Sequence, residues 1–108
     1  MPIRHEVLRV YETDPMVVIG LGDLAVLDPG QVAECREEIN ALMTLHDGKA
    51  LAVDLIDVQY IPSVLLGMLA SLTRLGTEVH LYNISAEVRD VLEVTHLCPL
   101  FKIHEHVL

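Results

Sequence analysis

Apolar and polar positions at the start of the chain follow a two-residue period, which is typical of strands. The segment HEVLRVYE at 5–12 shows strand-like alternation, and MVVIGL at 16–21 is a short run rich in β-branched residues. Asp14 and Pro15 form a turn signal between the two segments. We therefore predict a two-strand hairpin at one edge of a sheet.

The next segment has the spacing of an amphipathic helix. Asp28 stands at the capping position, Pro29 falls in the first turn, and Gly48 provides a natural stop. One side of this helix is apolar and is made of Val32, Cys35, Ile39, Leu42 and Met43. We expect this side to face the core.

Strands and helices then alternate to the end of the chain. ALAVDL at 50–55 is a continuous apolar strand, and EVHLYN at 78–83 and FKIHEHV at 101–107 are further strand-like pieces. A second helix opens at Ser63, and Ser85 caps a third helix. The order β-β-α-β-α-β-α-β predicts a single α/β domain over 1–108, with a mixed, mainly parallel sheet and about three helices on it.

The strand order also predicts where a site would lie. In such sheets the functional edge is beyond the carboxyl ends of the parallel strands, where the following helices begin. The loops that start at Asp54 and at Tyr82 are therefore expected to lie close together, with Ser63 and Ser85 along the same edge.

Composition narrows the function classes. The chain has 108 residues, of which 52% are hydrophobic, and a formal net charge of −9 without a cluster of Lys and Arg. Nucleic acid and an anionic membrane surface are therefore disfavoured as partners. No apolar run could span a bilayer and the N-terminus lacks an apolar signal core, so we expect a cytoplasmic protein without membrane insertion. The hydrophobic content fits either a full core or a homodimer interface.

A longer motif carries a family resemblance. The segment LAVDLIDVQYIPSVLLGMLASL at 51–72 resembles the central part of the STAS domain, the family of bacterial anti-sigma factor antagonists. The segment VHLYNISAEVRDVLEVTHLCPLFKIHE at 79–105 is similar to the next strand, third helix and closing segment of that family. Ser63 stands where the family carries its phosphorylated serine. The matching positions around it are Asp54, Leu55, Val58, Tyr60, Ile61, Leu66, Gly67 and Leu69.

The resemblance implies a STAS-like fold and a regulatory binding protein without enzymatic activity or cofactor. Such a domain docks an anti-sigma factor with kinase activity, which would phosphorylate Ser63. The residues implied in partner binding are Asp23, Asp57, Tyr60, Pro62, Ser63, Leu66, Gly67, Ala70 and Asn83.

Four positions depart from the family pattern. Pro62 replaces an Asp, Val64 replaces the second hydroxyl residue, Leu65 replaces a Gly, and Ala25 replaces the last Asp of the Gly-Glu-Leu-Asp segment. These changes keep a second reading open, in which the domain is a scaffold or accessory subunit of a signalling or transporter complex and is not phosphorylated.

A third reading is a small-ligand sensor with a groove near Tyr60 and Asn83. Catalytic motifs for phosphate binding or acyl transfer are absent from the sequence, which disfavours an enzyme.

Ser63 has two chemical interpretations. An unmodified serine at the start of a helix can cap it, and the same backbone donors and helix dipole favour a phosphate. We predict that one face of the helix, with Val64, Met68, Leu72 and Leu75 and with Leu65 and Leu69 beside them, is directed at the sheet. A separate stripe contains Ser63, Gly67, Ala70 and Arg74. Its small residues either let a partner approach or allow tight packing within the chain.

The histidines and cysteines are given ordinary roles. His104 and His106 form a His-x-His pair, but no spacing holds a cysteine or carboxylate beside them, so we expect solvated or capping side chains and no metal. His80 is expected on one face of the sheet with no chemistry. Cys35 and Cys98 are expected to be reduced and largely buried.

Overall fold

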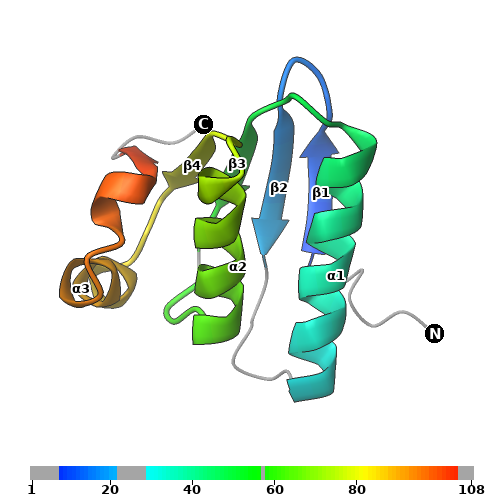
Figure 1. The fold of residues 1–108 in the computed structure, drawn as a ribbon. Coiled ribbons are helices and arrows are strands. Elements are labelled where there is room, and N and C mark those ends of the chain that lie inside the picture. Colours follow the sequence, from blue (N-terminus) through cyan, green and yellow to red (C-terminus); the bar gives the residue numbers. More distant parts are fainter. Residues whose placement is uncertain (1–7, 22–28, 57, 105–108) are drawn as a thin grey trace.

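The computed structural model describes residues 8–21, 29–56 and 58–104 (Figure 1). The predicted order of strands and helices is confirmed, with one additional 3₁₀ turn before the last strand. The elements are β1 (Leu8–Glu12), β2 (Val17–Leu21), α1 (Pro29–Leu45), β3 (Leu51–Asp54), α2 (Ser63–Arg74), β4 (Val79–Tyr82), α3 (Ala86–Val94), η3 (Cys98–Leu100) and β5 (Lys102–His104). The predicted cap at Asp28 lies outside the described residues.

The sheet has the order β1-β2-β3-β4-β5. β1 and β2 form the predicted antiparallel hairpin, and β2, β3, β4 and β5 are parallel to one another. Each parallel connection steps to the next strand, and crossovers of this kind are right-handed, so successive helices fall on the same face of the sheet. Figure 1 shows α1 and α2 side by side across that face.

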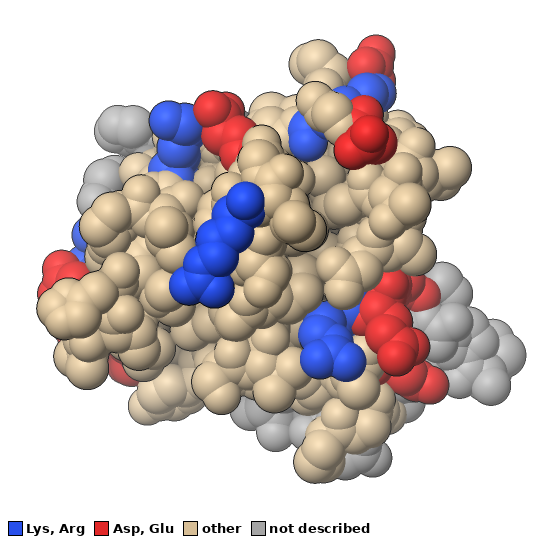
Figure 2. All heavy atoms as spheres, in the orientation of Figure 1, with Lys and Arg blue, Asp and Glu red and all other residues tan. Residues whose placement is uncertain are grey.

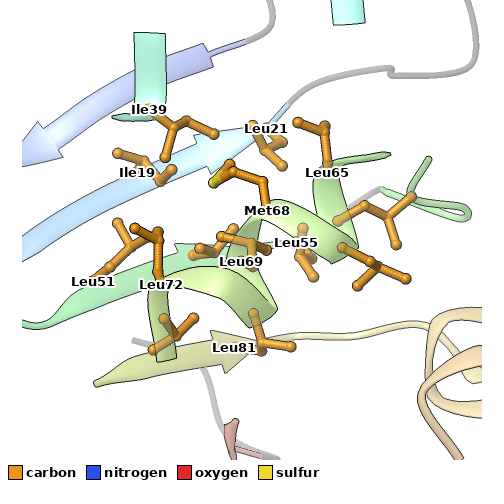
Figure 3. Close-up of a cluster of buried hydrophobic side chains, with 14 of the residues drawn as sticks. Ile19, Leu21, Ile39, Leu51, Leu55, Leu65, Met68, Leu69, Leu72 and Leu81 are labelled. Carbon is orange, nitrogen blue, oxygen red and sulfur yellow. The ribbon is translucent and has the colours of Figure 1, made fainter. Parts of the chain in front are cut away.

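The hydrophobic core lies between this face and the helices. Strand residues such as Ile19, Leu51 and Leu81 are fully buried and meet Leu65 and Leu69 of α2 (Figure 3). Burial of one such side chain contributes roughly 1.5–3 kcal/mol. The predicted apolar side of α1 is confirmed, and α3 adds two residues to the same core. These core residues of α1 and α3 are Val32, Cys35, Ile39, Met43, Val88 and Leu92.

The predicted buried side of α2 is confirmed for Leu65, Met68, Leu69 and Leu72 and is wrong for Val64 and Leu75. Val64 and Leu75 do not face the sheet, because their exposed fractions are 49% and 82%. Leu75 follows the last helical residue and serves as the C-cap. The side chains that α2 buries are Leu65, Leu66, Met68, Leu69, Ala70 and Leu72. The helix is therefore rotated about its axis by about one residue position relative to the prediction, so that Leu66 and Ala70 are buried in place of Val64 and Leu75.

The opposite face of the sheet carries alternate strand residues, which we call the open face. The strand register aligns Val18, Ala52, His80 and Lys102 in one row across it, and Gly20, Asp54, Tyr82 and His104 in the next. Tyr11 lies over Gly20, because a Cβ added there would be 2.6 Å from the Tyr11 ring. A side chain at position 20 would therefore require the half-exposed Tyr11 ring to move.

The two thiols differ in burial. Cys35 is fully buried in α1, and burial, followed by the charge of Glu38, raises its pKa to about 11. Cys98 is only partly buried, so the expectation of two largely buried thiols holds for Cys35 alone. Because the thiolate is the nucleophile, Cys35 is protected by both its location and its protonation.

We predict that iodoacetamide at mildly alkaline pH modifies Cys98 and leaves Cys35 unmodified until the domain unfolds. Peptide mass spectrometry after timed labelling measures both rates in one sample. A Cys98→Ser variant should remain unlabelled in buffer and take up one label in urea. Equal labelling of the two thiols in the folded domain would contradict this assignment.

Candidate functional site

The carboxyl ends of β3 and β4 are joined by hydrogen bonds. Asp54 Oδ1 accepts from Asn83 Nδ2 at 2.9 Å and from the backbone N–H of Ile56 at 3.1 Å. The backbone N–H of Leu55 donates to the Tyr82 carbonyl at 2.9 Å. Asn83 has a φ of 58°, a left-handed conformation that asparagine tolerates better than most residues. The predicted closeness of the Asp54 and Tyr82 loops is confirmed.

The far part of the β3–α2 loop is held against the start of α3. Ser85 Oγ donates to the Gln59 carbonyl at 2.8 Å and accepts from the Val88 N–H at 3.0 Å, so the predicted cap at Ser85 is confirmed. Gln59 Nε2 donates to Glu87 Oε2 at 3.3 Å. The Glu87 backbone N–H, then Gln59 and Ser85, lower the pKa of that exposed carboxyl below its usual value. The β3–α2 loop is thus held at its start by the Asp54–Asn83 hydrogen bond and further along by the Gln59–Ser85 hydrogen bond, before the chain enters α2.

A shallow hollow lies beneath the same loop. Its volume is about 280 Å³, and its lining is mainly apolar, with Leu55, Ile56, Val58, Gln59, Asn83 and Ser85 contributing. Asn83 therefore lines a hollow at the predicted edge, whereas Tyr60 is not part of its wall.

Ser63 does not cap α2. Pro62 occupies the N-cap position with φ −59° and ψ 141°, and its carbonyl accepts from the N–H groups of Leu65 and Leu66 at 3.0 and 3.1 Å. Ser63 is therefore the first helical residue, and no capping side-chain bond forms. Its side chain is exposed, and within the described part of the chain its hydroxyl makes no hydrogen bond. The hydroxyl is thus accessible to a modifying enzyme.

A groove runs along α2 from Ser63 toward α1, and we call it the helix groove. It encloses about 600 Å³ and is lined by Arg36, Glu37, Asn40, Ser63, Val64, Gly67, Met68, Ser71, Leu72 and Leu75. A Cβ added to Gly67 would meet nothing within 4 Å, so Gly67 is not required for close packing inside the chain. Figure 2 shows this helix side of the molecule, where broad uncharged areas separate a few charged side chains.

The residues predicted to bind a partner fall into three groups. Tyr60, Ser63 and Gly67 are exposed, with 60% exposure for Tyr60, and Pro62 and Asn83 are partly buried. Leu66 and Ala70 are each only 3% exposed and belong to the core of the domain. Asp23 and Asp57, and the substituted position Ala25, lie outside the described residues.

Sequence reasoning missed three exposed apolar residues near this site. Ile56 and Val64 are about half exposed and flank the stretch that contains Tyr60 and Ser63, and Leu75 ends the helix groove. The signal for Val64 was present in the sequence, because it is an apolar residue where the family pattern has a hydroxyl residue.

The family model of the STAS domain matches residues 3–107, almost the whole chain. The chain belongs to the STAS domain family. This STAS domain has the same fold as the solved anti-sigma-factor antagonist (STAS) domain protein from Planctomyces limnophilus, with a TM-score of 0.77 and 19% identity over 93% of this chain and 91% of that one. It also matches the anti-sigma factor antagonist SpoIIAA in its unphosphorylated form, with a TM-score of 0.72 and 20% identity over 93% and 90% of the two chains.

Two further findings complete the comparison of this STAS domain with known proteins. No curated protein matches its sequence. Among the described helices, none has the length and apolar character needed to cross a membrane.

We predict that the Asp54–Asn83 hydrogen bond stabilises the STAS domain and holds the β3–α2 loop. Replacement of Asn83 by Gly keeps the left-handed backbone accessible but removes the side-chain donor, and should lower the free energy of unfolding by about 1 kcal/mol. Asn83→Ala should cost more, because alanine also resists the positive φ. Urea unfolding of the two variants and the wild type measures both effects, and equal stability of all three would contradict the prediction.

Proposed function

We propose that this STAS domain is a regulatory binding protein of the anti-sigma factor antagonist type. It docks an anti-sigma factor with kinase activity in the bacterial cytoplasm, and phosphorylation of Ser63 releases the partner. The observation that carries the proposal is the exposed hydroxyl of Ser63 at the first position of α2, between the exposed side chains of Tyr60 and Val64. In this reading the domain is a substrate of the kinase and not itself an enzyme.

The electrostatics of α2 support a phosphate at this position. The first turn contains no acidic side chain, and a helix N-terminus carries partial positive charge with unpaired backbone donors. A phosphate would therefore be favoured by the helix, and the fold would tolerate it. Its charge of about −1.5 to −2 would instead act on a bound partner.

The neighbourhood of Ser63 suits a docking surface that such a charge would disrupt. Tyr60 and Val64, which lie three residues before Ser63 and one residue after it, are 60% and 49% exposed. A phosphate placed among them would have to be desolvated when a partner covers the surface, and burial of an unpaired charge is strongly unfavourable. The switch would then operate at the interface without a change of fold.

A structural neighbour belongs to the class of regulator that we propose. SpoIIAA is an anti-sigma factor antagonist whose solved form is described as unphosphorylated. With 20% identity this likeness concerns the fold, so the phosphorylation and the partner of the present domain are our proposal.

A constitutive scaffold is the second candidate, because of Pro62. Proline at the N-cap supplies no side-chain oxygen to the first turn and fixes φ, and Val64 beside Ser63 is apolar. A stiff, apolar helix start suits permanent docking in a signalling or transporter complex. The two candidates differ in whether the state of Ser63 changes partner affinity.

We predict that Ser63→Glu weakens capture of the partner at least tenfold, whereas Ser63→Ala binds like the wild type. Affinity capture from the source cell followed by mass spectrometry identifies the partner, and titration with the purified partner gives the affinities. Thr44→Glu, which adds the same charge at an exposed hydroxyl residue of α1, is the matched control and should bind normally. Equal binding by wild type and Ser63→Glu would leave the constitutive scaffold as the correct reading.

We also predict that a small substitution at Gly67 raises stability and that a large one weakens partner binding. Alanine in an exposed helix interior should raise the free energy of unfolding by about 0.5–1 kcal/mol, and the space above Gly67 is open. If the partner approaches α2 closely there, the larger Gly67→Leu variant should bind severalfold more weakly while remaining folded. Ser71→Ala, one turn further along the helix groove, is the control. Unchanged affinity of Gly67→Leu would exclude this part of α2 from the interface.

A further inference from the structure

Two histidines that are 24 positions apart in the sequence meet on the open face. His80 belongs to β4 and His104 to β5, and the register pairs Tyr82 directly with His104. His80 is therefore diagonal to His104 on neighbouring parallel strands. The spacing along either strand gives no sign of this meeting, and the expectation of a solvated or capping His104 was wrong.

The facing nitrogens of the two rings are in direct contact. His80 Nδ1 and His104 Nε2 are 2.8 Å apart, with the ring centroids 5.1 Å apart and the planes inclined by 16°. These values mean that the rings meet edge to edge. Tyr82 stacks on the face of His104, with centroids 4.3 Å apart and an angle of 6°. The position of the His104 ring is thus fixed by a neighbour on the adjacent strand.

A carboxylate determines the direction of the hydrogen bonds. Glu78 Oε1 lies 2.8 Å from His80 Nε2, and a carboxylate can only accept, so Nε2 carries the hydrogen. In neutral His80 the lone pair is therefore on Nδ1, directed at His104.

Glu78 and His80 are arranged like a metal-ligating histidine and the carboxylate that supports it. A ligating histidine usually donates its second ring N–H to a carboxylate, which orients the ring and raises its basicity. Here Glu78 performs that task for His80, and the side chain of His80 is only 15% exposed. Lys102 Nζ lies 4.0 Å from the other Glu78 oxygen, which holds the carboxylate from its outer side.

We propose that His80 and His104 bind a transition-metal ion that prefers imidazole ligands, such as Zn²⁺, with Glu78 as the positioning residue for His80. Zinc–nitrogen bonds of about 2.0–2.1 Å in a tetrahedral site require the two nitrogens to separate from 2.8 Å to about 3.3 Å, and both rings must turn so that their lone pairs converge on the ion. The hydrogen on His104 Nε2 moves to Nδ1 when that nitrogen binds the ion. The net proton count does not change.

The site offers two protein ligands, and water completes the coordination. Among the described residues there is no group of three or more His, Cys, Asp or Glu side chains placed to hold an ion. Two imidazoles select ions such as Zn²⁺, Ni²⁺ and Cu²⁺ over Mg²⁺ and Ca²⁺, which prefer oxygen ligands. A bound ion would link β4 to β5 across the open face, on the side of the sheet opposite the helix groove.

The test is titration of the untagged full chain with Zn²⁺, followed by calorimetry and by NMR of the imidazole nitrogens. We expect one ion per chain, with the largest shifts at His80 Nδ1, which binds the ion, and at both ring nitrogens of His104, of which Nε2 binds the ion and Nδ1 gains the hydrogen, and no response to Mg²⁺. His80→Gln and His104→Gln should each weaken binding at least tenfold. Glu78→Gln should weaken it about tenfold, which is the effect expected of a supporting carboxylate.

His46→Gln, on the partly buried His46 at the end of α1, is the control and should bind as the wild type does. Unchanged Zn²⁺ affinity in both His80→Gln and His104→Gln would overturn the proposal, as would loss of binding only in His106→Gln. In that case the His80–His104 contact is only a hydrogen bond that ties β4 to β5. Neither result bears on Ser63, so this site and the proposed function are tested separately.

Discussion

The handedness of the β-α-β connection decides how this domain is laid out. Three successive crossovers each move one strand further in the same direction, from β2 to β5. A right-handed path then places the helices on one face, and that face becomes the core. Two other features follow from this constraint. The carboxyl ends of the parallel strands share one edge with the helix N-termini, and the second face of the sheet carries the alternate side chains of the strands.

The site near Ser63 depends on that shared edge and on a small number of polar contacts. The Asp54 carboxylate at the end of β3 accepts a hydrogen bond from the Asn83 side chain after β4. The Gln59 carbonyl accepts one from the Ser85 hydroxyl at the start of α3. Each such bond contributes about 0.5–1.5 kcal/mol. The loop is therefore ordered by several modest interactions and not by a single strong one. The hydroxyl of Ser63 takes no part in them, so its modification would leave the loop's own support intact.

The sequence predicted what depends on local chemistry and missed what depends on packing. The hairpin, the order of elements, the buried side of α1 and the cap at Ser85 follow from period, turn residues and capping preferences. The side of α2 that faces the sheet could not be derived from the sequence. Apolar residues occupy most of the helix's own circumference, and several stripes of them fit the helical spacing equally well. The N-cap residue is Pro62 and not Ser63, because the Pro62 carbonyl accepts the first hydrogen bonds of the helix. The contact between His80 and His104 arises from the relative register of β4 and β5, which the sequence does not state.

The β1 edge of the sheet has a consequence for behaviour at high concentration. The pairing of β1 with β2 shifts register between Val10 and Glu12. An edge strand offers unpaired backbone groups to other chains, and a bulge interrupts that template. Copies of this hydrophobic domain are therefore not expected to extend one another's sheets through β1.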